Sequence, residues 1–138
     1  MTTGLFLLGI CHVVTAAGLP EAARWGRLLL ALGGIATIVV AASPQPAAAH
    51  SPAAAVGFVA LTLWPVFSRL PRPAVGAAAT LVLLALLIWL GVEIQGGDAL
   101  GLSERLLAGA QALWPLVVVL LVWVSERRGR SAVAAPAA

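Results

Sequence analysis

The sequence predicts an all-α protein, a polytopic bundle of transmembrane helices, and three observations support this fold class. Of the 138 residues, 62% are hydrophobic and only 9% are charged, whereas a soluble domain carries about 25% charged residues. The apolar residues form five runs, each near the length of about 20 residues that a helix needs to cross a bilayer. The arginines cluster between alternate runs. We therefore expect five spans, with the N-terminus outside and the C-terminus in the cytoplasm.

Short polar breaks separate the five apolar runs. The runs cover residues 1–19, 24–42, 50–68, 73–92 and 103–124. Prolines fall in three of the breaks, and proline ends helices because it lacks the N–H that the helix ladder needs. Ser103 is expected to cap the last helix, with Glu104 in its first turn. Residues 1–128 are thus predicted to form one integral membrane domain, followed by a disordered cytoplasmic tail, 129–138.

The arginines set the orientation of the bundle. Seven of the eight fall on one side of an alternating five-helix path, and cytoplasmic loops carry an excess of Lys and Arg. These topology-determining residues are Arg24, Arg27, Arg69, Arg72, Arg127, Arg128 and Arg130. The net charge of +3 therefore reflects topology and not a nucleic-acid partner. We expect a multi-pass protein of the cell inner (plasma) membrane, with the lipid bilayer as its surroundings.

Tryptophan placement agrees with this topology. Trp25, Trp64 and Trp123 fall near the inner interface and Trp89 near the outer one, and tryptophans gather at both membrane–water interfaces. Trp114 lies deeper, so helix packing is its expected role. Trp64 and Trp114 each precede a proline, which predicts a kink in each helix.

Two alternatives concern the N-terminal part of the chain. Residues 24–49 also resemble a signal peptide, with arginines, an apolar core and three alanines before His50. N-terminal sequencing that began at His50 would establish such a cleavage. The first apolar run starts almost at Met1, with no charge before it. We expect that the native protein has one more helix upstream, which would give six spans with both ends cytoplasmic.

Several short stretches resemble one known family. They are residues 9–19, the run 28–42 that leads through Ser43-Pro44 to His50, and residues 101–106 and 110–115. Along most of the chain, these stretches are similar to the domain-of-unknown-function 998 family. The resemblance implies a six-helix bacterial membrane protein, of which this chain begins at the second helix. The family carries no established activity, so the resemblance leaves the function open.

Two polar residues deep inside predicted spans are the intramembrane site candidates. His12 lies about 16 Å deep at 1.5 Å per residue, and ionisable groups at such depth are rare and commonly functional. It would serve as a proton relay or metal ligand, or as a neutral imidazole bonded to a neighbouring helix. Gln111 is expected to hold helices together, because an amide in hydrocarbon needs a partner. Lining a polar pathway is the alternative for Gln111.

Four further polar residues map to the outer face, namely His50, Glu93, Asp98 and Glu104. Such residue types can bind a divalent cation. No pair has a metal-site spacing, however, so solvated loop ends are the simpler interpretation. The sequence has no catalytic motif, nucleotide fingerprint or metal-ligand motif. We expect no catalytic residue, no cofactor and no metal.

Small residues spaced four apart predict close helix packing, within the chain or with a partner. They are Ala53 and Gly57; Gly33, Thr37 and Ala41; and Ala108 and Ala112. The leading hypothesis is a non-enzymatic protein that acts through helix–helix association, as a homo-oligomer or with another membrane protein. The second is a small transporter or proton-coupled carrier that uses His12 and Gln111. The third is an intramembrane metal-dependent lipid hydrolase that uses His50, Glu93 and Asp98.

Overall fold

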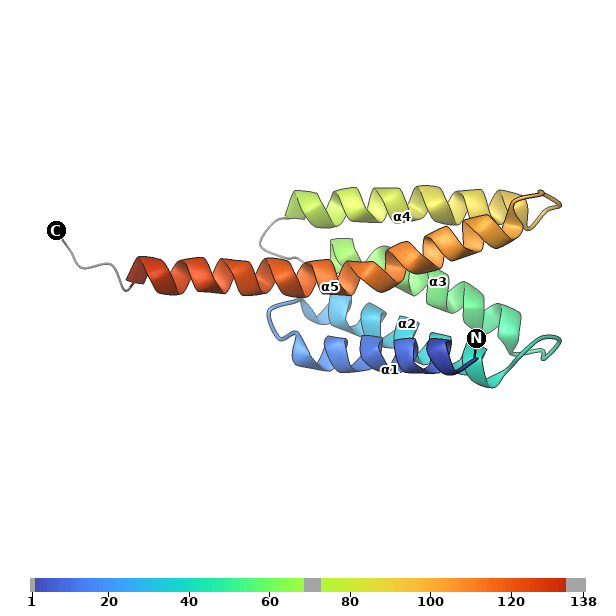
Figure 1. Cartoon of the computed structure of the whole chain (residues 1–138), viewed down its shortest axis with the longest axis horizontal. Coiled ribbons are helices and arrows are strands. Elements are labelled where there is room, and N and C mark those ends of the chain that lie inside the picture. The colour runs from blue at the N-terminus through green and yellow to red at the C-terminus, as the bar shows by residue number, and fades with distance from the viewer. Residues whose placement is uncertain (1, 69–72, 134–138) are drawn as a thin grey trace.

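The computed structural model describes residues 2–68 and 73–133, and this part of the chain forms five α-helices and no strand (Figure 1). In chain order the helices are α1 (Thr2–Gly18), α2 (Arg24–Ala42), α3 (His50–Phe67), α4 (Pro73–Glu93) and α5 (Leu100–Val133). They run alternately up and down the bundle, and each packs mainly on its neighbour in sequence. The predicted all-α bundle is confirmed.

The start of α1 and the end of α5 lie at opposite ends of the bundle, as an odd number of crossings requires (Figure 1). One end holds the start of α1 together with the α2–α3 and α4–α5 loops, and we call it the N-terminal end. The α1–α2 loop lies at the opposite end, from which α5 projects. The distribution of arginines predicts that the N-terminal end faces the outside.

The helices are apolar enough to make the chain a membrane protein. α2, α3, α4 and the Leu100–Ser125 part of α5 each have the length and hydropathy of a membrane span. α1 is apolar but has only 17 residues, or about 26 Å at 1.5 Å per residue, and a bilayer core is about 30 Å thick. Large apolar side chains such as Val14, Leu81 and Ile88 cover the outward surface, as expected for contact with lipid.

Glycines let neighbouring helices approach until their backbones touch. A Cβ added to Gly9 of α1 would lie 2.6 Å from the carbonyl oxygen of Gly34 in α2, and one added to Gly34 would lie 2.7 Å from that of Gly9. In the next interface, Gly33 of α2 lies directly against the side chain of Leu61 in α3. The small-residue face around Gly33 is therefore used for packing inside the chain.

The tryptophans divide between the core and the surface. Trp64 is 0% exposed and packs in the main apolar cluster, so it does not face the membrane interface as predicted. The reason is that Trp64 lies on the buried face of α3, and this helix packs against α2, α4 and α5. Trp114 packs against the same cluster, as expected. Trp25 and Trp123 are exposed, and the guanidinium of Arg127 lies 3.8 Å from the ring centre of Trp123.

The last helix begins earlier and ends later than the sequence predicts. It starts at Leu100, so Ser103 lies inside the helix, where its hydroxyl donates to the Leu100 carbonyl at 2.9 Å instead of capping the N-terminus. The helix continues to Val133, because no proline follows the predicted span before Pro136. Residues 129–133 of the predicted tail are therefore helical.

The described arginines among the topology-determining residues lie at the end of the bundle opposite the N-terminal end. Arg27 donates to the carbonyl oxygens of Ala16 at 2.8 Å and Ala17 at 3.3 Å, near the C-terminus of α1, where positive charge is favoured. Arg24 is exposed at the start of α2. Arg69 and Arg72 lie outside the described residues, and Arg128 and Arg130 belong to α5 without a description of their side chains.

Candidate functional site

A cavity of about 510 Å³ opens at the N-terminal end of the bundle. α1, α2, α3 and α5 supply its walls, together with the α2–α3 loop. Thr2, His50 and Glu104 line its outer part, and His12 and Gln111 are the polar residues farthest inside. His12 lies about 15 Å along α1 from Thr2 at 1.5 Å per residue. The cavity therefore reaches toward the middle of the membrane.

The His12 side chain is 2% exposed, and neither ring nitrogen has a hydrogen-bond partner. The backbones of Leu8 and Gln111 approach the ring without forming a hydrogen bond to it. Packing holds the side chain in place, because a Cβ added to Gly34 of α2 would lie 2.9 Å from the His12 Cβ. The large majority of buried side-chain polar atoms have a partner, although the indole nitrogens of Trp64 and Trp114 also lack one in this structure. An enclosed imidazole without one, beside a cavity, marks a place for a bound molecule or a water.

Gln111 has its partners within the bundle. Its amide nitrogen donates to the Phe58 carbonyl oxygen at 2.9 Å and to the Thr62 hydroxyl at 3.0 Å, and both acceptors belong to α3. Both hydrogen bonds join α5 to α3, which is the geometry that a residue holding helices together would have. The amide positions α5 against α3 beside the inner part of the cavity.

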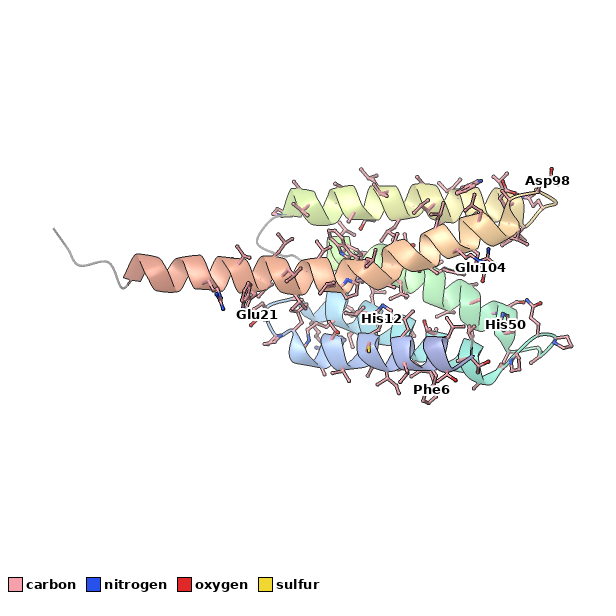
Figure 2. All side chains as sticks on the ribbon, viewed as in Figure 1. Phe6, His12, Glu21, His50, Asp98 and Glu104 are labelled. Atoms are coloured by element: carbon pink, nitrogen blue, oxygen red, sulfur yellow. The ribbon has the colours of Figure 1, made fainter. Side chains whose placement is uncertain are left out.

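His50 and Glu104 lie near the N-terminal end, and His12 lies farther along the bundle (Figure 2). His50 Nδ1 lies 2.8 Å from the Ser43 carbonyl oxygen, and it donates because a carbonyl can only accept. This bond ties the start of α3 to the end of α2 and leaves Nε2 of a neutral ring as an acceptor. Glu104 is exposed and is the one charged residue among those that line the described cavity.

Comparison with known proteins supports the predicted relationship. A family model described as protein of unknown function (DUF998) matches residues 1–136. The chain belongs to the DUF998 family. The match covers every residue that lines the cavity. No curated protein and no solved structure matches this DUF998 chain.

The other two outer-face candidates lie away from the cavity of this DUF998 protein. Glu93 accepts hydrogen bonds from Trp89 Nε1 at 2.9 Å and from the Ala99 N–H at 2.8 Å, so its carboxylate holds the α4–α5 loop. Asp98 lies in that loop, well apart from His50 (Figure 2). Within residues 2–68 and 73–133, no group of three or more His, Cys, Asp or Glu is placed to hold a metal ion. These residues therefore do not supply the ligand set that the hydrolase hypothesis requires.

Thr37 of α2 also lines the cavity, although the sequence places it only on a small-residue face. Its hydroxyl donates to the Gly33 carbonyl at 2.8 Å within its own helix, which leaves the oxygen able to accept a hydrogen bond. The feature of the sequence that could have singled out Thr37 was its hydroxyl group inside an apolar run. Recognising it as a cavity residue requires knowing which helices are neighbours, and periodicity does not supply that.

Proposed function

We propose that this DUF998 protein binds a small amphipathic molecule in the cavity between α1, α2, α3 and α5. The observation that carries the proposal is the enclosed His12 imidazole, which has no hydrogen-bond partner and lies at the inner part of that cavity. A ligand hydroxyl, amine or carbonyl group at this depth would supply the missing hydrogen bond.

The size and lining of the cavity support this function. Small-molecule sites typically measure about 300–1,000 Å³ and combine apolar walls with a few placed polar groups, and this cavity measures about 510 Å³. Leu8, Val40, Phe58 and Leu61 are among its apolar lining residues. Such walls would hold the apolar part of a ligand, while the polar residues would orient its head.

The charge of the lining favours a neutral or cationic ligand. Glu104 is its one charged side chain, and no arginine lines the described cavity. An anionic head would meet this carboxylate without a compensating positive group, and like charges disfavour binding. Hydroxyl or amine groups, in contrast, can donate to Glu104 and to Nε2 of His50.

The substitution His12→Phe tests the proposal, because phenylalanine keeps an aromatic ring and removes both nitrogens. We expect it to weaken binding of monobutyrin, a short amphipathic probe with a glycerol head, by about 2- to 13-fold. This corresponds to about 0.5–1.5 kcal/mol for one hydrogen bond. Calorimetry on the full chain in nanodiscs measures the effect. Val14→Ala, on the outward face of α1, is expected to keep the wild-type affinity.

Two results would contradict the proposal. Equal affinity of wild type and His12→Phe would remove His12 from the site. Absence of monobutyrin binding, together with absence of any amphipathic molecule in native mass spectra of the gently extracted protein, would remove the site itself.

Transport of the bound molecule would extend this function. The residues that line the cavity belong to the N-terminal half of the bundle's height, from its loops to the level of His12. A carrier would therefore need a second conformation that opens to the opposite end. Flux of the bound probe into proteoliposomes that was the same for wild type and His12→Ala would exclude a pathway through His12.

Helix–helix association with a partner is the second candidate function. The observation that favours it is the glycine-rich and alanine-rich character of the helices, although Gly33 and Gly57 pack inside the chain, near Leu61 and Ala36. An associating protein is expected to elute from a mild-detergent column as a complex or to retain a second protein. Elution as a single chain without a companion would count heavily against this candidate.

A further inference from the structure

A second cavity, of about 250 Å³, adjoins the first between α1 and α5. Leu8, His12 and Ala112 line both cavities. The other lining residues of the second cavity all belong to α1 or α5, and they are Cys11, Thr15, Pro115, Leu116 and Val119. We call this cavity the α1–α5 groove. His12 stands at the junction between the groove and the outer cavity.

The α1–α5 groove opens on the lipid-facing surface of the bundle. α1 packs closely along α2, but its contact with α5 is slight. Cys11, Leu116 and Val119 are exposed, and this surface faces hydrocarbon in a protein that spans the membrane. The groove therefore opens to the lipid on one side and borders the outer cavity on the other, where Leu8, His12 and Ala112 form the shared wall.

We infer that the ligand is a single-tailed lipid that enters from the side, with its polar head in the outer cavity and its tail beside His12 in the α1–α5 groove. This inference rests on the binding function proposed above. It names the class of ligand and the route by which that ligand reaches the cavity.

The apolar tail explains why the cavity needs a side opening. A lipid tail is stabilised by the hydrocarbon around it, and drawing a long tail wholly into a cavity that opens to water at the N-terminal end would forfeit part of that stabilisation. A groove that borders the cavity and opens to the bilayer would let the head enter the cavity while the tail stays in an apolar environment. The unpartnered His12 nitrogens then lie where head and tail meet, next to the ester or hydroxyl group of a neutral lipid.

Photo-crosslinking locates the tail. Monomyristin, a long-chain relative of monobutyrin, would carry a diazirine in its tail and be added to the full chain in nanodiscs. We expect crosslinks at Cys11, Thr15, Leu116 and Val119 that excess unlabelled monomyristin removes. Competable crosslinks confined to α2 and α3 would overturn the inference, and so would labelling of all lipid-facing helices that no competitor reduces.

A matched pair of substitutions tests the route. Thr15→Phe fills the groove at a residue that does not line the outer cavity, whereas Val14→Phe adds the same ring to the outward face, where Val14 is 64% exposed. Thr15→Phe is expected to weaken monomyristin binding about tenfold or more, as overpacking a filled site does, and to leave monobutyrin binding unchanged. Val14→Phe is expected to change neither.

The two ligands separate this inference from the proposed function. Unchanged monomyristin binding in Thr15→Phe would overturn the side entry while leaving the outer cavity as a binding site. If wild type bound neither ligand, both proposals would fall. If Thr15→Phe lost both ligands, Val119→Phe would block the groove from the α5 side. Loss of both ligands there as well would show that the groove is not a separate compartment and would overturn the inference.

Discussion

Gln111 and His12 line the same cavity but differ in their hydrogen bonding. The Gln111 amide donates to two acceptors on α3, so its polarity is used to hold helices together. The two nitrogens of His12 have no partner, so its polarity is not used by the fold. This difference separates a residue whose polar atoms stabilise the bundle from one whose polar atoms the fold leaves without a partner.

At this scale we predict that Gln111→Leu lowers the stability of the bundle by about 0.6–2 kcal/mol, the range of hydrogen bonds between membrane helices. The loss stays modest because the Phe58 carbonyl and the Thr62 hydroxyl can find other partners. Reversible unfolding in mixed micelles measures it. A double-mutant cycle with Thr62→Val should show a coupling energy well above zero, and strict additivity would contradict a direct bond.

The interface between α1 and α2 shows how single helices are held in place. Gly9 and Gly34 bring the two backbones together, and this contact also presses His12 against α2. Without a strong hydrophobic force between helices in lipid, such close packing supplies much of the association energy. The geometry of the cavity therefore depends on glycines that carry no chemistry of their own.

At the scale of the helix we predict opposite effects for two glycine substitutions. Gly34→Ala forces a Cβ to within 2.7 Å of the Gly9 carbonyl oxygen and should destabilise the protein by about 1–3 kcal/mol. Gly109→Ala has nothing within 4 Å of the added atom and should be neutral or stabilising by up to about 1 kcal/mol. Thermal unfolding in nanodiscs compares the pair. Equal effects would mean that the α1–α2 contact is looser than described.

The starts and ends of the helices show which structural features can be predicted from local sequence alone. The predicted second run matches α2, and the predicted third and fourth runs end within one residue of α3 and α4, because proline and length constraints act within each segment. The start of α5 was missed because Glu93, on the preceding helix, holds Ala99 through a hydrogen bond. Such a contact joins residues of two helices and has no local signature.

For the whole molecule, the position of a residue along its helix could be predicted from the sequence, but the identity of the neighbouring helices could not. Counting residues placed His12 and Gln111 near mid-membrane and His50 and Glu104 at the outer end. That these four surround one cavity, while Glu93 and Asp98 lie elsewhere, depends on the arrangement of α1, α2, α3 and α5 around the bundle. Periodicity within a helix does not determine the order of helices.

The orientation of the bundle leads to a prediction at this scale. In a variant without the single native thiol, Cys11→Ser, new cysteines at Asp98 and Glu21 would report on the two ends, where both residues are exposed (Figure 2). A membrane-impermeant maleimide should label Asp98→Cys on intact cells. It should label Glu21→Cys only after permeabilisation, because cytoplasmic loops carry the arginines. The reverse pattern would invert the topology and place the cavity mouth in the cytoplasm.

The length of α5 has a further consequence. Its 34 residues measure about 51 Å at 1.5 Å per residue, and the hydrocarbon core is about 30 Å thick. The helix therefore continues well past the other four (Figure 1). The part beyond the hydrocarbon core is a rigid helical extension about 20 Å long. A reporter protein fused after this helix would be held away from the lipid headgroups by a rigid extension. It would not lie against them, as it could on a flexible linker.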